Sequence, residues 1–254
     1  MSFLKKLSLS LITLVLGSFI FVGILENYKS DESIKVKQLE DYYNPSREAV
    51  NACLKRQNEL YLHYPNYGGS FRLLFDELKS LMKKPALKSS HQYGLLLEAY
   101  GKNLREVQSI QKELPIKVEE CRSDVFLKLE NLAIVTGSFD YFSLEAKKRA
   151  EHLNAIDKVF REKLKENNGE FKPEDLVLLM RKFGEIDHSS EEEWKKLILE
   201  FDVMLPMLEN YSMILTEIEI EKYKVESNFF NSVRVEAAKH LNSRFEQGFF
   251  SWLI

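Results

Sequence analysis

The chain has 254 residues, of which 44% are hydrophobic, so it is long enough to bury a core and is not a disordered tail. Val, Ile and Thr do not gather into the alternating runs typical of strands, and Gly and Pro are few, which predicts an all-α protein. The net charge is −3 and Lys and Arg form no cluster, which argues against a nucleic-acid partner.

The first element is an uncharged stretch of nineteen residues, 7–25, with the sequence LSLSLITLVLGSFIFVGIL. As a helix it would be about 28 Å long, close to the thickness of a hydrocarbon core. Lys5 and Lys6 precede the stretch, and mainly acidic residues follow it. The positive-inside rule then predicts a single-pass signal anchor with a cytoplasmic N-terminus and an extracytoplasmic main domain, periplasmic in a bacterium.

A cleaved signal peptide is the alternative interpretation of this stretch. Its best cleavage site, Val15-Leu16-Gly17, matches the small-residue pattern poorly and would leave an apolar new N-terminus, so the uncleaved anchor is favoured. The predicted organisation is a short cytoplasmic N-terminus, a transmembrane anchor, a juxtamembrane helix extension and an extracytoplasmic helical domain, at residues 1–6, 7–25, 26–43 and 44–254 respectively.

Asn44-Pro45 is predicted to break the juxtamembrane extension and to start a helix that ends near His63. Pro65 to Gly69 is predicted to be a loop rich in aromatic residues, followed by a short amphipathic helix. The inward positions of the first helix step by three and four, and they are Val50, Cys53, Gln57, Leu60 and Tyr64.

The strongest periodicity runs from Tyr93 to Leu132 and continues in register across Pro115, which predicts one long, kinked helix with a seam close to a heptad. Further helices are predicted from Ser143 to about Glu166, between Pro173 and Gly184, and from a capping box at Ser190 onwards. Together these elements predict an N-terminal single transmembrane helix followed by an elongated antiparallel helical bundle with coiled-coil-like seams.

The two cysteines, Cys53 and Cys121, both lie on predicted seams. They are too few for a disulfide framework and too far apart in sequence for a zinc ribbon or a redox Cys-x-x-Cys motif. One disulfide between them and two buried thiols remain as alternatives that the sequence does not separate.

No phosphate-binding loop, dinucleotide fingerprint, hydrolase elbow or zinc-protease helix is present in the sequence. Glu236 and His240 share a helical face, but one such pair is more typical of a solvated helix surface than of a metal site. The sequence therefore predicts no catalytic residue, cofactor or metal, and a protein that is not an enzyme.

The C-terminus carries an apolar group that needs a covering surface, whether the domain's own core, another protein or the bilayer interface. Its members are Phe245, Phe249, Phe250, Trp252, Leu253 and Ile254. The function predicted first is a membrane-anchored scaffold or interaction subunit, whose partners are the bilayer through residues 7–25 and other membrane or envelope proteins, with oligomerisation left open. An extracytoplasmic sensor or ligand-binding bundle that acts through a partner is the alternative.

Overall fold

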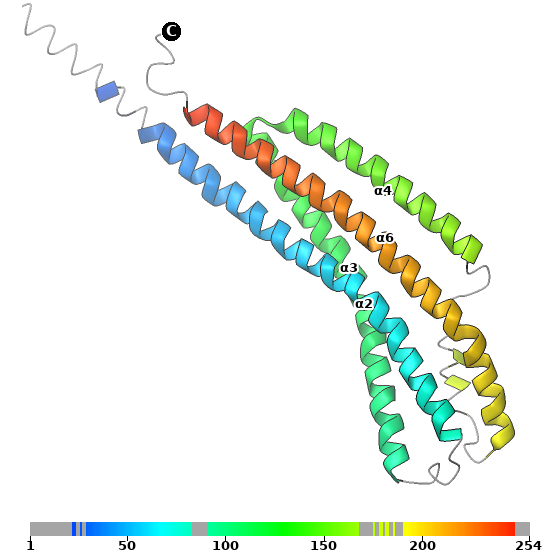
Figure 1. The fold of residues 1–254 in the computed structure, drawn as a ribbon. Coiled ribbons are helices and arrows are strands. Elements are labelled where there is room, and N and C mark those ends of the chain that lie inside the picture. Colours follow the sequence, from blue (N-terminus) through cyan, green and yellow to red (C-terminus); the bar gives the residue numbers. More distant parts are fainter. Residues whose placement is uncertain are drawn as a thin grey trace, which may run out of the picture. The chain divides into compact units, whose positions relative to one another are not determined.

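The fold is known from a computed structural model of the chain. It describes residues 22–23, 26, 29–82, 91–167, 175, 178–179, 181–182, 185 and 190–246. In this part of the chain the structure is helical and contains no strand, which confirms the all-α prediction. The main elements are η1 (Leu39–Tyr43), α2 (Asn44–Met82), α3 (His91–Thr136), α4 (Phe139–Asn167) and α6 (Glu191–Glu246), drawn in Figure 1.

Across the described ranges no helix combines the length and the apolarity that a membrane crossing requires. The predicted anchor, residues 7–25, lies outside the described residues apart from Val22 and Gly23. The aromatic C-terminal tail after Glu246 also lies outside them, as does the side chain of Phe245.

The helices contribute to two compact units. Unit 1 comprises Met1–Val50, Val125–Glu145 and Phe230–Ile254, and unit 2 comprises Asn51–Asp124 and Ala146–Phe229. In unit 1 the start of α2, the end of α3, the start of α4 and the end of α6 share a core. Its apolar members include Val50, Leu129, Leu132, Phe142, Phe230, Val233 and Leu241.

Unit 2 contains an apolar cluster that joins α2, α3 and α6. Trp194 and Phe201 of α6 pack in it with a row of α2 residues at helical spacing, Phe71, Leu74, Phe75 and Leu78. Each such side chain contributes about 1.5–3 kcal/mol when it is fully buried. Contacts between Tyr64 and Ser212 and between Lys79 and Asp202 show that α2 and α6 run in opposite directions.

The seams predicted from the sequence face inward where the structure describes them. Val50, Cys53, Gln57, Leu60 and Tyr64 of α2 are all buried. The α3 seam is buried at Leu104, Val118, Cys121, Val125, Leu129 and Leu132, and the helix continues through Pro115 as predicted. Ser190 Oγ accepts a hydrogen bond from the Glu193 backbone N–H, which is the bond expected from the predicted capping box.

The helix break predicted at Asn44-Pro45 is wrong, because η1 continues directly into α2. The Asn44 N–H donates to the Leu39 carbonyl, five residues back, so the backbone turns more widely just before Pro45. Pro45 then lies in the first turn of α2, where the missing N–H costs little, and Ser46 Oγ donates to the Tyr43 carbonyl at 2.8 Å.

The loop predicted at residues 65–69 is also wrong, because α2 is helical through Pro65, Gly68 and Gly69. Tertiary contacts stabilise the helix there: Ser212 Oγ of α6 donates to the Tyr64 carbonyl at 2.9 Å. A Cβ atom on Gly68 would lie 3.3 Å from the same Ser212 Oγ, so glycine permits this close approach of α6 to α2. The aromatic residues of the supposed loop instead belong to the helix, with Tyr64 and Phe71 buried.

The two glycines give a matched prediction. Gly69→Ala has open space around its new methyl group, so we expect it to raise the free energy of unfolding by about 0.5–1 kcal/mol through helix propensity. Gly68→Val places additional atoms against Ser212, so we expect it to lower the free energy of unfolding by about 1–3 kcal/mol. Urea denaturation of both variants measures the difference, and equal effects at the two positions would contradict the close approach.

The connection from α3 to α4 is a tight turn at Gly137. Gly137 has φ +76°, and the Ser138 N–H donates to the Ala133 carbonyl at 2.9 Å, which is the Schellman ending of a helix. The next helix therefore begins at Phe139 rather than at Ser143. Phe142 is buried in this helix, whereas Leu144 is exposed.

Candidate functional site

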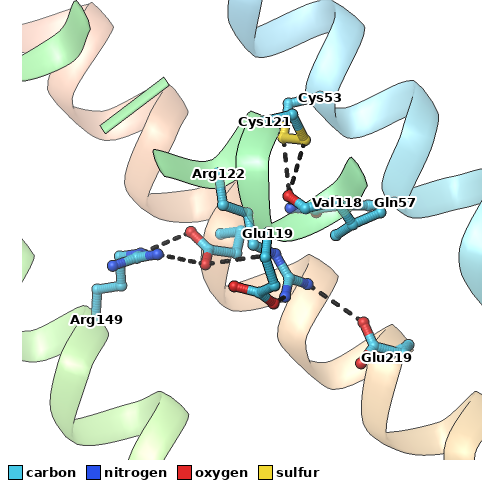
Figure 2. The surroundings of a disulfide bond; sticks show 9 residues. Cys53, Gln57, Val118, Glu119, Cys121, Arg122, Arg149 and Glu219 are labelled. Atoms are coloured by element: carbon cyan, nitrogen blue, oxygen red, sulfur yellow. Dashed lines mark hydrogen bonds and ion pairs between the residues drawn. A yellow bond between two sulfur atoms is a disulfide. The ribbon is translucent and has the colours of Figure 1, made fainter. Parts of the chain in front are cut away.

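The best-defined group of polar residues lies in unit 2 around a disulfide bond between α2 and α3 (Figure 2). Cys53 and Cys121 are bonded, their Cα atoms are 5.3 Å apart, and 68 positions separate them in the sequence. The two residues are only 0% and 9% exposed. Their position follows from the seams, because each cysteine occupies an inward position of its helix.

Two arginines and two glutamates, Arg122, Arg149, Glu219 and Glu226, form what we call the charge cluster. Arg149 of α4 donates from Nε and Nη2 to the two carboxylate oxygens of Glu226, each at 2.6 Å. Arg122 of α3 donates from Nη2 to Glu219 of α6 at 3.2 Å, and its Nε lies 3.8 Å from Glu226 Oε1. The charge cluster thus connects α3, α4 and α6.

These ion pairs matter for stability because the side chains that form them are buried. The Glu226 side chain is 1% exposed and the Arg122 side chain 6%, and a buried charge without a partner costs several kcal/mol. The two positive and two negative charges balance. Lys222 adds a further cation near Glu219, at 3.9 Å, and also pairs with Asp157 of α4 at 3.0 Å.

This arrangement is suited to holding the helices together and is poorly suited to catalysis. Both oxygens of Glu226 accept hydrogen bonds from Arg149, and an arginine does not release a proton at physiological pH. A carboxylate so engaged is poorly placed to act as a base. Among the residues that the structure describes, no three His, Cys, Asp or Glu side chains are grouped so as to hold a metal ion.

Two tyrosines of α2, Tyr64 and Tyr67, are largely covered by the neighbouring helices. Burial raises the pKa of Tyr67 to about 12, with a smaller contribution in the same direction from Tyr211. Burial, with help from Glu219 and Tyr211, also raises the pKa of Tyr64, and Arg122 opposes that shift. Both phenols therefore stay protonated at neutral pH and serve the packing of α2 against its neighbours.

His63 gives a pH-dependent prediction. Burial lowers its pKa below the ordinary value of 6.5, and the Val107 backbone and the Gln111 side chain of α3 oppose this shift. Below pH 6.5 the unfolded chain then binds more protons at this position than the folded chain, so the folded protein loses stability as the pH falls. The slope from one histidine is at most about 1.4 kcal/mol per pH unit.

We expect the free energy of unfolding, measured in urea between pH 7 and pH 5.5, to fall less steeply for His63→Leu than for the unmodified chain. The apolar side chain removes the proton uptake and leaves the other titrating groups in place. Identical slopes for the two proteins would contradict a depressed pKa at His63.

An apolar groove lies between α4 and α6 in unit 2, with a volume of about 460 Å³. Its floor and walls are formed by Ala155, Ile156, Val159, Ile218 and Ile220. Lys163 and Glu217 form an ion pair at 2.6 Å across the two helices in its lining. The groove offers shape and apolar surface but few polar groups that could orient a ligand.

A second apolar surface is an exposed row on α6, formed by Leu199, Val203 and Met207, which we call the α6 row. The three residues are 65%, 62% and 36% exposed. Successive members are four positions apart, so they lie along one face of the helix. The row has the spacing by which one helix can receive the apolar face of another.

Of the residue pairs considered from the sequence, the structure joins Cys53 and Cys121 covalently. Glu236 and His240 approach to 3.6 Å on a partly exposed face of α6, where they form an ordinary helix pair. The C-terminal group from Phe249 to Ile254 lies outside the described residues.

Sequence reasoning missed the charge cluster. Glu226 lies eight residues after Ile218, at a position where the apolar period of the last helix points inward, and a glutamate there is a signal for a buried partner. The partners could not be found from the sequence, because Arg122 and Arg149 are 104 and 77 residues away along the chain. No protein-family model, curated protein or solved structure matches this chain.

Proposed function

We propose that the chain is a non-enzymatic, membrane-anchored scaffold or interaction subunit of a membrane-associated assembly. In this proposal residues 7–25 form a single transmembrane helix, and the rest is an elongated antiparallel bundle with coiled-coil-like seams on the extracytoplasmic side. The observation that carries the interaction role is the α6 row, three apolar side chains left exposed along one face of a 56-residue helix.

Two observations support the proposed extracytoplasmic location of the helical domain. The uncharged stretch from Leu7 to Leu25 has the length of a membrane span, with Lys5 and Lys6 on the predicted cytoplasmic side. Disulfides such as Cys53–Cys121 form and persist mainly in oxidising compartments outside the cytoplasm.

Topology is tested with the full chain carrying a reporter after residue 254, combined with carbonate extraction of membranes. We expect the reporter to lie outside the cytoplasm and the chain to stay in the membrane fraction. A cytoplasmic reporter would overturn the predicted orientation, and release by carbonate would overturn the anchor.

The interaction role is tested by placing a photo-crosslinking amino acid at Val203 in the α6 row. The control position is Ile116, an exposed residue of α3 with charged residues one turn away on either side. We expect a defined crosslinked product at Val203 and none at Ile116. Val203→Glu should abolish co-purification of that product's partner, and Ile116→Glu should preserve it. A chain that is monomeric and uncrosslinked at both positions in native membranes would overturn the proposal.

A sensor or ligand-binding bundle is the second candidate, and the groove between α4 and α6 favours it. Its volume, about 460 Å³, lies within the range of about 300–1,000 Å³ for small-molecule sites. A thermal-shift screen should then find apolar ligands that stabilise the chain, and Val159→Trp, which fills the groove, should remove the effect. A screen without a stabilising ligand would discard this candidate and leave the scaffold proposal standing.

A further inference from the structure

The disulfide and the charge cluster meet at two consecutive residues of α3. Successive side chains of an α-helix point about 100° apart, so neighbours can serve different helices. Cys121 is bonded to Cys53 of α2, whereas Arg122 reaches Glu219 and Glu226 of α6. Figure 2 shows the disulfide and the guanidinium group on different sides of the same stretch of α3.

The charge cluster depends on the exact placement of Arg122. Its guanidinium contacts Glu219 at 3.2 Å and lies 3.8 Å from Glu226, and both carboxylates are largely withdrawn from water. Holding a long arginine side chain in one conformation costs conformational entropy, and this cost is smaller when the backbone that carries it is already fixed. The covalent bond at Cys121 fixes that backbone against α2.

We infer that the disulfide and the charge cluster act as one oxidation-dependent folding device. Formation of the Cys53–Cys121 bond holds Arg122 where it can neutralise Glu219 and Glu226, and without the bond the buried carboxylates are less well compensated. The helical body therefore completes its packing only in an oxidising compartment. The inference concerns folding and does not depend on an anchor or on a partner.

The chemical step is an ordinary thiol–disulfide exchange with an oxidised dithiol as the co-reactant. The thiols of Cys53 and Cys121 lose two protons and two electrons and form one S–S bond. The co-reactant's S–S bond breaks, and it leaves as two thiols. Because the sulfur-bearing residues are almost fully buried in the final structure, exchange takes place before α2 and α3 are packed.

The test is a double-mutant cycle on the full chain in detergent micelles, with urea unfolding as the readout. Arg122→Met is measured in the oxidised protein and in the Cys53→Ala/Cys121→Ala background. We expect it to raise the unfolding equilibrium constant at least tenfold more in the oxidised protein. Lys163→Met, which breaks an exposed ion pair with Glu217, is the matched control and should have the same effect in both backgrounds.

A second measurement covers the case in which the cysteine-free chain does not fold. The ratio of disulfide to dithiol forms is measured at equilibrium in a glutathione buffer, for the unmodified chain, Arg122→Met and Lys163→Met. Because coupling is reciprocal, Arg122→Met should lower this ratio at least tenfold, whereas Lys163→Met should leave it within twofold. An unchanged ratio for Arg122→Met, or equal effects of this substitution in both backgrounds of the cycle, would overturn the inference.

Discussion

Replacing both cysteines by alanine is expected to lower the free energy of unfolding by about 4 kcal/mol, the loss calculated from chain entropy for a closed loop of this length. The loop between Cys53 and Cys121 spans 68 positions, so the crosslink removes many conformations from the unfolded chain. Urea denaturation of the oxidised protein and the double variant measures the loss.

Two comparisons make this result interpretable. Keeping the unmodified chain reduced with excess dithiol throughout the urea titration should reproduce the loss without any change of side-chain volume. The midpoint of the double variant should not respond to the dithiol. A loss below about 1 kcal/mol would mean that the bond restricts the unfolded chain little or strains the native one.

The second large effect is expected at the Arg149–Glu226 pair. Arg149→Met leaves the carboxylate of Glu226 buried without its two closest donors, and removal of one partner from a buried pair costs about 3–5 kcal/mol. Arg122, 3.8 Å from Glu226, offsets part of this cost, so we expect a value near the lower end. The change in the free energy of unfolding is measured in urea.

The double variant Arg149→Met/Glu226→Leu separates a charge effect from a packing effect. It removes both charges and keeps similar volumes, so most of the lost stability should return. Lys163→Met is the exposed control, with an expected cost of less than about 1 kcal/mol. A double variant as unstable as Arg149→Met alone would show that packing around Arg149, which also lies over the Phe229 ring, dominates.

The predictions that the structure confirms rest on local patterns. Periodicity placed Val50, Cys53 and Leu60 on an inward face, and the same reasoning carried the long helix through Pro115. The capping box at Ser190 could likewise be predicted, because its donor and acceptor are three residues apart.

The two wrong helix breaks have different physical causes. The low helix propensity of Pro65 and Gly68-Gly69 is visible in the sequence. The hydrogen bond that stabilises the helix there is not, because Ser212 and Tyr64 are 148 residues apart along the chain. Tertiary packing overrode propensity there. At Asn44-Pro45 a wider turn accommodated the proline, and no local pattern indicated that turn.

The sequence by itself determined the helical class, the inward faces of α2 and α3 and the uncharged stretch at residues 7–25, because each depends on residues within a few turns of one another. Only the tertiary structure decided that Cys53 meets Cys121, and that Arg122 and Arg149 neutralise the buried Glu226. The spacing of a helical pattern tells which way a side chain points. It does not tell which helix lies opposite, since that choice depends on the packing of the whole unit.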